Sequence, residues 1–508
     1  MVESAAAALP LDRAVVVIGA GTMGAGIAEV AATAGHPVYL CDTSDAALDR
    51  GRAQIRASID KRIARARIGK DEGEAIYARV TPAGSATKLE YVGLVIEAIV
   101  ENLDIKTAAL RDIAARVDAE AILATNTSSL SVTALASRLP QPERVVGMHF
   151  FNPATILPLV EVVRGQASDS QVIDTIMATA RAWKKVPVAC QSTPGFIVNR
   201  VARPFYGEAL RLLLEQHTAP ATLDAVMREC GGFRMGPCEL MDLIGHDVNF
   251  AVTRSVWEGF FHDPRYQPSL VQKQLVDAGW LGRKSGRGFY AYGDEQSPPA
   301  ADDLQGVPTT RVRIEGELGP AEPLAVLIEE AGIPLQRVDG QGVLRVDGLA
   351  LALTDGRSAA VRATALGEPV VLFDLALDYR TSTRIALAGA LDVTEAQLAS
   401  AAGLFTALGK KVSVLGDAAG LAVSRTVAML VNEAADAVQQ GIASESDVDA
   451  AMTGGVNYPL GPLAWGRKVQ LPYIAGVLRH LSDAYGEDRY RVSPWLQARA
   501  QSGATAHG

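Results

Sequence analysis

The 508-residue sequence lacks long apolar runs and has only four cysteines (Cys41, Cys190, Cys230 and Cys238). The cysteines form no CxxC pair and are too few to crosslink a chain of this length, so we expect a reducing compartment. No stretch of about 18 apolar residues occurs, which predicts that no helix spans a membrane. The first residues, MVESAAAALPLDR, place an acid where a signal peptide has basic residues. These absences predict a cytoplasmic protein without a membrane partner.

An excess of positive charge is also absent, because 48 Lys and Arg residues face 57 Asp and Glu residues, a formal net charge of −9. Such a chain is not expected to bind nucleic acid. The hydrophobic content of 48% and the charged content of 21% are ordinary for a globular protein, and the length allows several domains. We expect no metal site.

The segment from residue 13 to residue 42, RAVVVIGAGTMGAGIAEVAATAGHPVYLCD, has the pattern of a strand, a glycine turn, a helix and a second strand. The apolar run Ala14–Ile18 is typical of a strand buried on both faces. We expect a helix over Ala25–Ala34, ended by Gly35, and a second strand over Val38–Cys41. This order is typical of the first unit of a doubly wound parallel sheet.

Gly19, Gly21 and Gly24 form the motif GxGxxG between the first strand and its helix. These glycines would allow a tight turn, a close approach of the backbone to a pyrophosphate, and close packing of helix on strand. Asp42 ends the second strand, where a carboxylate binds the ribose hydroxyls and repels a 2′-phosphate, and no arginine follows it. The pattern predicts NAD rather than NADP; the alternative is a glycine-rich turn in another kind of α/β unit.

Residues 50–70, RGRAQIRASIDKRIARARIGK, carry eight Lys and Arg residues and a single acid. Ile55, Ile59 and Ile63 recur at every fourth position, which predicts a helix with one apolar stripe and a basic remainder. A basic face is usually solvated. The alternative is a binding surface for a polyanionic ligand, since local positive charge attracts phosphates.

Two further apolar segments end in polar residues at the expected edge of the sheet. The segment 93–102, GLVIEAIVEN, contains Glu97 and Glu101, and the segment 121–132, AILATNTSSLSV, contains Ser128. Ligands of open α/β sheets bind beyond the carboxyl ends of the strands. We therefore expect Ser128 beside the nicotinamide, with His149 at the end of the following strand.

His149 stands in the apolar stretch GMHFFNPATILPLVEVVRG, residues 147–165. A lone histidine in such a stretch is more often a core residue bonded to a backbone carbonyl than a functional group. Glu161 follows after twelve residues and a turn, so we expect it on the adjacent strand, within reach of His149.

Taken together, these segments resemble the L-3-hydroxyacyl-CoA dehydrogenase family. The resemblance covers residues 13–293 and is carried by the motifs GAGTMGAGIAEVAATAGH, EAIVENLDIK, TNTSSL, HFFNP with the following LVEV, STPGFIVNR and MGPCELMDLIG. It implies an N-terminal Rossmann domain that binds NAD, an all-helical domain after it, and oxidation of the 3-hydroxyl of an acyl-CoA substrate.

The resemblance implies a catalytic role for four residues. His149 would be the base, Glu161 the carboxylate that orients it, Ser128 the contact to substrate hydroxyl and nicotinamide, and Asn199 the fourth member. Oxidation of a secondary alcohol needs a group that accepts the hydroxyl proton near neutral pH, which an imidazole can do. A carboxylate on its other nitrogen fixes the tautomer and stabilises the imidazolium.

The resemblance also implies binding residues. The family's NAD contacts correspond to Gly19, Gly21, Thr22, Met23, Gly24, Asp42, Glu101, Lys106, Ser128, Asn152 and Lys284. Ser58 and Arg65, on the basic helix, match its coenzyme A contacts, although the family more often has lysine at the latter position.

From Ser192 the sequence becomes helical, since STPGFIVNRVARPFYGEALRLLLEQ begins with a Ser/Thr cap and continues with apolar residues at helical spacing. Pro204 should kink this helix. We expect the helical domain to reach about Tyr292, followed by a Pro- and acid-rich linker over residues 293–303.

Beyond the linker the chain repeats itself. Residues 195–240 align without a gap to residues 420–465 at a constant shift of 225, which matches Arg200 with Arg425 and Glu208 with Glu433. The repeat has Ser424 in place of Asn199, residues 305–415 contain no GxGxxG, and no histidine lies between His262 and His480. Of the two alternatives, a second active site or a structural copy, the pattern favours the copy.

We therefore expect an α/β protein of four parts. These are a Rossmann NAD-binding domain over 1–192, a helical domain over 193–293, a degenerate Rossmann-like segment over 294–415 and a second helical copy over 416–508. In shorter members of the family the helical domain forms the dimer contact. The chain would then be either a homodimer or a monomer with an internal pseudo-dimer.

The resemblance of the full-length layout extends to bacterial members that oxidise 3-hydroxyadipyl-CoA in phenylacetate breakdown. The alternatives are a 3-hydroxybutyryl-CoA dehydrogenase and, more remotely, a non-catalytic crystallin-like protein. Arg203 follows Asn199 by four residues, so on one continuous helix both would face the cleft, and Arg203 could bind the terminal carboxylate of an adipyl chain. Otherwise Arg203 pairs with an acid such as Glu208, or is turned away by the kink at Pro204.

Overall fold

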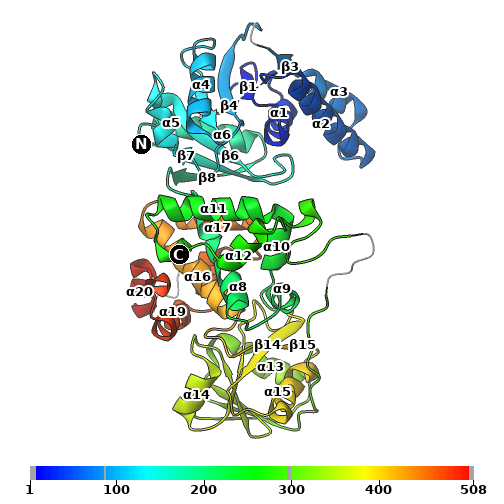
Figure 1. Ribbon diagram of the computed structural model, residues 1–508, viewed down its shortest axis with the longest axis vertical. Helices are drawn as coiled ribbons and strands as arrows, with labels where there is room; N and C mark the ends of the chain where they lie inside the picture. Colours follow the sequence, from blue (N-terminus) through cyan, green and yellow to red (C-terminus); the bar gives the residue numbers. More distant parts are fainter. Residues whose placement is uncertain (1–6, 85–86, 294–298, 503–508) are drawn as a thin grey trace. The chain divides into compact units, whose positions relative to one another are not determined.

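The computed structural model describes residues 7–84, 87–293 and 299–502 (Figure 1). The acidic start of the chain and residues 294–298 of the expected linker lie outside the described residues. Two compact units divide the chain: unit 1 runs to Asn199 and includes Gln440–Val456, and unit 2 includes Arg200–Gln439 and the residues from Asn457 onward. No described helix is long and apolar enough to cross a membrane.

Unit 1 contains an eight-stranded sheet in the order β3-β2-β1-β4-β5-β6-β7-β8. Neighbouring strands are parallel except for β6 and β7, which are antiparallel. The strands are β1 (Ala14–Ile18), β2 (Val38–Cys41), β3 (Val80–Ala83), β4 (Val92–Glu97), β5 (Ile122–Thr125), β6 (Val145–Phe150), β7 (Leu159–Arg164) and β8 (Val186–Gln191). This is the expected doubly wound sheet with its cofactor-binding first unit at the centre.

Helices cover the sheet of unit 1 (Figure 1). They are α1 (Thr22–Ala34), α2 (Asp45–Ala64), α3 (Lys70–Ala78), α4 (Leu103–Ala114), α5 (Val132–Ala136), η1 (Pro142–Arg144), α6 (Ser170–Ala182) and α17 (Glu445–Val456). Short α7 (Val198–Val201) begins in this unit. The core lies between the sheet and helices such as α1, whose Ile27 is fully buried.

The first two predicted strands are confirmed at their exact bounds, whereas two helix boundaries differ. The first helix begins at Thr22, three residues earlier than expected, and ends at Gly35 with φ 112°. The basic helix does not reach residue 70: α2 ends at Ala64, and Ala66 has φ 51°, a left-handed conformation that cannot continue a helix. Charge and apolar spacing continue across this turn, so the pattern does not reveal it.

The helices of unit 2 come from both sequence copies. They are α8 (Arg203–Leu214), α9 (Pro220–Glu229), α10 (Pro237–Ile244), α11 (His246–Gly259), η2 (Pro264–Tyr266), α12 (Leu270–Asp277), η3 (Arg283–Ser285), α16 (Val423–Gln439), α18 (Pro462–Lys468), α19 (Leu471–Tyr485), η5 (Asp488–Tyr490) and α20 (Pro494–Gln501). The expected kink at Pro204 is instead a break: α7 ends at Val201, and Pro204 lies in the first turn of α8. Proline is favoured there because a first-turn amide needs no helical acceptor.

Unit 2 also contains a seven-stranded mixed sheet in the order β10-β9-β11-β12-β13-β14-β15. The strands are β9 (Val312–Glu315), β10 (Leu335–Val338), β11 (Val343–Val346), β12 (Leu349–Leu353), β13 (Val370–Phe373), β14 (Arg384–Gly389) and β15 (Lys411–Val414). The accompanying helices are η4 (Gly319–Ala321), α13 (Pro323–Glu330), α14 (Ala359–Leu366) and α15 (Glu395–Ala407). The predicted α/β fold class is therefore confirmed.

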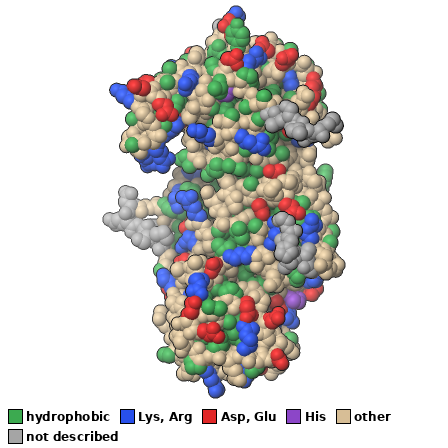
Figure 2. Space-filling view, turned by 180° about the vertical axis from the view of Figure 1, so that it is seen from behind, with side chains coloured by type: hydrophobic (Ala, Val, Ile, Leu, Met, Phe, Trp, Pro, Cys, Tyr) green, Lys and Arg blue, Asp and Glu red, His purple; other side chains and the backbone are tan. Residues whose placement is uncertain are grey.

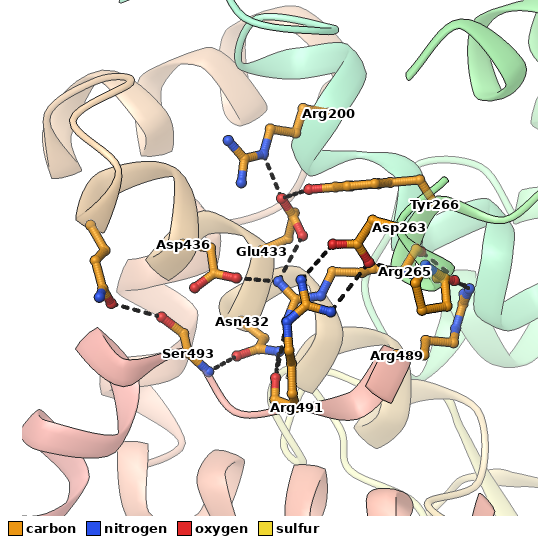
Figure 3. A network of polar contacts seen from close by, with 12 residues as sticks. Arg200, Asp263, Arg265, Tyr266, Asn432, Glu433, Asp436, Arg489, Arg491 and Ser493 are labelled. Carbon is orange, nitrogen blue, oxygen red and sulfur yellow. Dashed lines mark hydrogen bonds and ion pairs between the residues drawn. The ribbon is translucent and has the colours of Figure 1, made fainter. Parts of the chain in front are cut away.

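A buried carboxylate, Glu433, joins the two helical copies within unit 2 (Figure 3). Arg200 Nε donates to it at 2.6 Å, Arg265 Nη1 lies 3.2 Å away, and the hydroxyl of Tyr266 donates as well. Burial opposes ionisation of Glu433, but the two arginines hold its pKa below the ordinary value. The first helical copy thus encloses an acid of the second.

Glu208 is enclosed in the same way by residues of the second copy. It accepts hydrogen bonds from Arg425 Nε at 3.0 Å, Arg489 Nη2 at 2.8 Å and the hydroxyl of Tyr490 at 3.0 Å. Glu208 and Glu433 are matched by the repeat, so the two clusters are reciprocal. Such self-complementary pairing is typical of a two-fold interface, here between two parts of one chain.

Candidate active site

The glycine motif forms a turn between β1 and α1 that brings backbone close to backbone. Gly19 has φ 102°, and a Cβ there would lie 2.6 Å from the carbonyl oxygen of Ala98. A Cβ on Gly24 would lie 1.8 Å from the carbonyl oxygen of Gly19, whereas Gly21 faces open space within 4 Å. The first amides of α1, at Thr22 and the residues after it, therefore lie beside an open approach suited to a pyrophosphate.

Asp42 lies at the carboxyl end of β2, beside this turn. Its Oδ2 accepts a hydrogen bond from the amide of Ala20 at 2.8 Å, and its Oδ1 accepts one from Ser44 at 3.1 Å. The carboxylate is thereby fixed next to the glycine turn, where a ribose of NAD would lie and a 2′-phosphate would be repelled. The residues present at this end of the sheet fit NAD.

Lys106, a predicted NAD contact, is only 1% exposed and lies between two carboxylates. Its Nζ is 2.8 Å from Glu97 Oε2 and 3.2 Å from Glu101 Oε2. The lysine therefore neutralises two acids beneath the cofactor end of the sheet, and its direct contact with NAD stays a prediction.

Glu101 holds the turn that carries Ser128. It accepts hydrogen bonds from the amides of Ser128 and Ser129, both at 3.1 Å, and from the hydroxyl of Thr127. Burial opposes its ionisation, but Lys106 and these donors together hold the pKa of Glu101 below its ordinary value. Glu101 was predicted as a cofactor contact, and nothing in its sequence context indicated this structural role.

His149 and Glu161 form a buried pair across antiparallel strands β6 and β7, where they face each other in register. The distance from His149 Nδ1 to Glu161 Oε2 is 2.7 Å, and the two residues are 6% and 0% exposed. The rings of Phe151 and Phe196 lie 4.6 and 5.9 Å from the imidazole ring. The predicted adjacency of the two side chains is confirmed, and a backbone-bonded core histidine is not what the structure contains.

The second oxygen of Glu161 is bonded to the start of the next helix. Oε1 accepts hydrogen bonds from the amides of Ile197 at 3.0 Å and Val198 at 2.9 Å. The same helical turn carries Asn199, whose Nδ2 lies 3.4 Å from the carbonyl oxygen of Ser128. One carboxylate thus connects His149 to the segment that brings Asn199 to Ser128.

Asn126 is a supporting residue that sequence analysis missed. Its Oδ1 accepts a hydrogen bond from the amide of Phe150 at 2.8 Å, which fixes the end of β6 next to His149. Its position in the motif TNTSSL, two residues before Ser128, is the sequence feature that could have indicated this role.

Ser58 and Arg65 lie on α2 and just after it, in the basic segment. The hydroxyl of Ser58 is hydrogen-bonded to buried Glu29, which Arg62 contacts at 3.1 Å, and burial raises the pKa of Glu29. Arg65 is exposed, as are Arg50, Lys61, Arg67 and Lys70. Figure 2 shows Lys and Arg side chains at this edge of unit 1.

The other predicted contacts divide between the units. Asn152, in unit 1, is exposed after β6. Lys284, in unit 2, is half exposed and forms an ion pair of 2.5 Å with Asp247. The described residues contain no group of three or more His, Cys, Asp or Glu side chains arranged to hold a metal ion.

Arg203, in unit 2, is 6% exposed and does not pair with Glu208, which is occupied by Arg425 and Arg489. Its Nη1 donates to Thr253 Oγ1 at 3.0 Å, and its guanidinium lies 4.8 Å from the ring centre of Tyr206. Burial lowers its pKa. The single continuous helix assumed for Asn199 and Arg203 is wrong, because α7 and α8 are separate helices.

The second sheet, as far as it is described, lacks the His149–Glu161 pair. The register of β14 on β15 equals that of β7 on β8 after a shift of 225 residues, so Ala386 stands where Glu161 does. Asp374 directly follows β13, and its amide donates to the carbonyl oxygen of Ala386 at 3.0 Å, so Asp374 takes the place of His149.

Asp374 nevertheless keeps one function of the missing glutamate. Its carboxylate accepts hydrogen bonds from the amides of Ala422 at 2.9 Å, Val423 at 2.8 Å and Ser424 at 3.0 Å, at the start of α16. Burial raises the pKa of Asp374 to about 6, although these amides oppose the rise. The second half retains the carboxylate that anchors the helix and has no base beside it.

Family models match most of the sequence. The NAD-binding domain of 3-hydroxyacyl-CoA dehydrogenase matches residues 14–193, and its C-terminal domain matches residues 195–292 and again 420–507. A 3-hydroxybutyryl-CoA dehydrogenase reduced Rossmann-fold domain matches residues 351–418. The chain belongs to the 3-hydroxyacyl-CoA dehydrogenase family.

Individual relatives agree with this membership. The 3-hydroxyadipyl-CoA dehydrogenase of Escherichia coli (strain K12) is 42% identical over 488 residues, 96% of this chain and 97% of that protein. Pig mitochondrial hydroxyacyl-coenzyme A dehydrogenase is 35% identical over 289 residues, 56% of this chain and 92% of that protein. The crystal structure of an Escherichia coli K12 3-hydroxybutyryl-CoA dehydrogenase matches with a TM-score of 0.89 and 42% identity, over 97% of this chain and all of that one.

Membership of the 3-hydroxyacyl-CoA dehydrogenase family makes this chain an NAD-dependent oxidoreductase. The predictions of enzyme class and cofactor are thereby confirmed, and the remote alternative of a non-catalytic, crystallin-like protein is not supported. The full-length relatives carry names for both an adipyl and a butyryl substrate.

Proposed function

We propose that this enzyme oxidises the 3-hydroxyl of L-3-hydroxyadipyl-CoA, with 3-hydroxybutyryl-CoA as the alternative substrate. The observation that carries the chemistry is the buried His149–Glu161 pair at the carboxyl end of β6, next to the turn that holds Ser128. The choice of the adipyl chain is supported by similarity over nearly the whole length to the Escherichia coli protein of that name. Its place in phenylacetate breakdown rests on the resemblance alone.

In this mechanism His149 removes the hydroxyl proton of the substrate. Its Nδ1 is bonded to Glu161, so Nδ1 carries the hydrogen and Nε2 is left as the proton acceptor. The carboxylate stabilises the imidazolium that forms, without taking the proton itself. Bound NAD supplies the acceptor for the hydride that leaves C3. Burial of the pair excludes water and strengthens the interaction between the two groups.

Ser128 and Asn199 orient the substrate in the proposal. Glu101 fixes the turn of Ser128, and buried Glu161 fixes the start of α7 through Val198, so a carboxylate holds the segment of each polar side chain. Holding reacting groups in place before the reaction lowers its entropic cost. We assign the adenine end of coenzyme A to Ser58 and Arg65, since the exposed basic residues of α2 and its following turn suit phosphates.

The remaining proposals concern architecture and location. We divide the chain into four domains at residues 192, 293 and 415. The first two domains form the catalytic half, and the last two form a structural copy of it. The reciprocal clusters around Glu208 and Glu433 support an internal pseudo-dimer in a monomeric chain over a homodimer through the same surface. The four cysteines are free thiols, which suits a cytoplasmic enzyme.

The substrate proposal is tested by initial rates of NADH formation with both acyl-CoAs. We expect kcat/KM for 3-hydroxyadipyl-CoA to exceed that for 3-hydroxybutyryl-CoA by about tenfold or more. Arg203→Met should then raise KM for the adipyl substrate about tenfold, in line with about 1.5–3 kcal/mol for a charged hydrogen bond. The butyryl substrate, without a carboxylate, should be nearly unaffected.

Arg211→Met is the matched control, because Arg211 lies on the same helix and pairs with Glu487. It should leave the ratio of the two substrates unchanged. A preference for the butyryl substrate would favour the alternative enzyme. Equal effects of Arg203→Met on both substrates would show that this buried arginine is structural.

A further inference from the structure

Helix α17 belongs by sequence to the second helical copy, yet it is part of unit 1 (α17, orange in Figure 1). It packs on β7 and β8. The amide of Gln191, the last residue of β8, donates to the carbonyl oxygen of Ile442 at 2.9 Å, just before α17. The catalytic sheet is therefore completed by a segment that lies some 250 residues later in the chain.

The exchange is reciprocal. α9, the counterpart of α17 in the first copy, packs on β14 in unit 2. Gly416, the counterpart of Gln191, donates its amide to His217, the counterpart of Ile442, at 2.7 Å. Each helical copy thus supplies a helix to the sheet of the other half, and the arrangement of α17 is not an isolated contact.

Gly455, near the end of α17, contacts the residues that surround the catalytic pair. A Cβ at this position would lie 2.6 Å from Leu159 Cδ2, 3.2 Å from Val198 Cγ2 and 3.7 Å from Phe151 Cε1. Val198 donates its amide to Glu161, and the ring of Phe151 lies against that of His149. A single residue therefore separates Gly455 from each member of the pair: Phe151 from His149, and Val198 from Glu161.

The equivalent position in the first copy, directly after α9, carries a different residue. Cys230 stands there, and it is buried with its Sγ 3.3 Å from the carbonyl oxygen of Leu375. The sheet of unit 1 therefore packs against a helix that carries Gly455 near its end, and the sheet of unit 2 packs against a helix that is followed by Cys230. A helix with the larger residue could not take the place of α17 without displacing Leu159, because even a Cβ comes too close.

We infer that Gly455 is a positioning residue of the dehydrogenase: its missing side chain lets Phe151 and Val198 hold His149 and Glu161 in the reactive arrangement. The second half of the chain would then have a direct part in catalysis, although it lacks a base of its own. The role of Gly455 rests on the proposed roles of His149 and Glu161.

The test compares Gly455→Ala with Gly454→Ala in the full-length enzyme. Both changes add one methyl group to the same helix, but a Cβ at Gly454 meets nothing closer than Leu159 Cβ at 3.6 Å. We expect Gly455→Ala to lower kcat about tenfold while KM for NAD and the melting temperature stay near those of Gly454→Ala. A small displacement of a reacting group is enough to lower the rate strongly.

A compensating change separates positioning from general damage. Leu159→Val removes a carbon where Gly455→Ala adds one, so the double variant conserves volume and should recover kcat. If Gly455→Ala does not fold, kcat of the double variant is the test. A kcat near that of the unchanged enzyme supports the inference, and a low kcat overturns it. Equal kcat for the two alanine variants, or a loss that Leu159→Val does not restore, would also overturn it. The proposed function itself is tested separately, through His149.

Discussion

Replacing His149 by glutamine is expected to lower kcat by about two to four powers of ten, the usual contribution of a positioned base. Glutamine is similar in size and can still donate a hydrogen bond to Glu161, but it cannot accept a proton at neutral pH. The rate of NADH formation under saturating NAD and substrate measures the loss. We expect the pocket to keep its shape, because the two phenylalanine rings beside His149 remain in place.

Binding of NADH to the same variant is the control. The glycine turn follows β1 and Asp42 follows β2, whereas His149 is on β6, so the dissociation constant of NADH and the melting temperature should stay close to those of the unchanged enzyme. Near-full turnover in His149→Gln would refute the proposed base. A matching loss of NADH affinity would show that the change disturbs the fold.

Truncation after Tyr292 is expected to lower kcat/KM about a hundredfold or more, although every proposed catalytic residue is retained. The fragment loses α17, which leaves Gln191 and the faces of Leu159 and Val198 without their partners. It also removes Glu433 from Arg200 and Arg265, so two buried cations lose their acid. The exposed surface should make the fragment dimerise or aggregate, which sedimentation would reveal.

A variant of the fragment tests the cause of the loss. In a fragment dimer, Glu208 of one copy could replace Glu433, and α9 could take the place of α17. Cys230 would then collide with Leu159, so Cys230→Gly should restore part of the activity of the dimer. A fragment that is monomeric and fully active would refute the role assigned to the second half.

The local features of this molecule followed from local sequence. The strands Ala14–Ile18 and Val38–Cys41 are short apolar runs between strong turn signals, so their bounds were predictable. The pairing of His149 with Glu161 followed from a spacing of one turn between two strands. The end of α2 was not predictable, because the basic and apolar pattern continues through the turn at Ala66.

The features that were missed depend on contacts between distant segments. The sequence repeat indicated two similar halves, but a repeat is equally compatible with separate halves or with exchanged helices. The packing of α17 on β7 joins segments that lie far apart in the chain, and no periodicity of the sequence contains this information. The roles of Glu101 and Asp374 likewise depend on hydrogen bonds that their carboxylates accept from backbone amides distant in the sequence.

The most direct test of the proposed base is a double-mutant cycle on His149 and Glu161. If the two residues act as one unit, each single change to glutamine removes most of what the pair provides, and the effects are not additive. We expect Glu161→Gln to lower kcat substantially and the double variant to be no slower than His149→Gln alone. Additive losses, with the double variant slower by the product of the two single factors, would show that Glu161 acts independently of His149 and would contradict the mechanism.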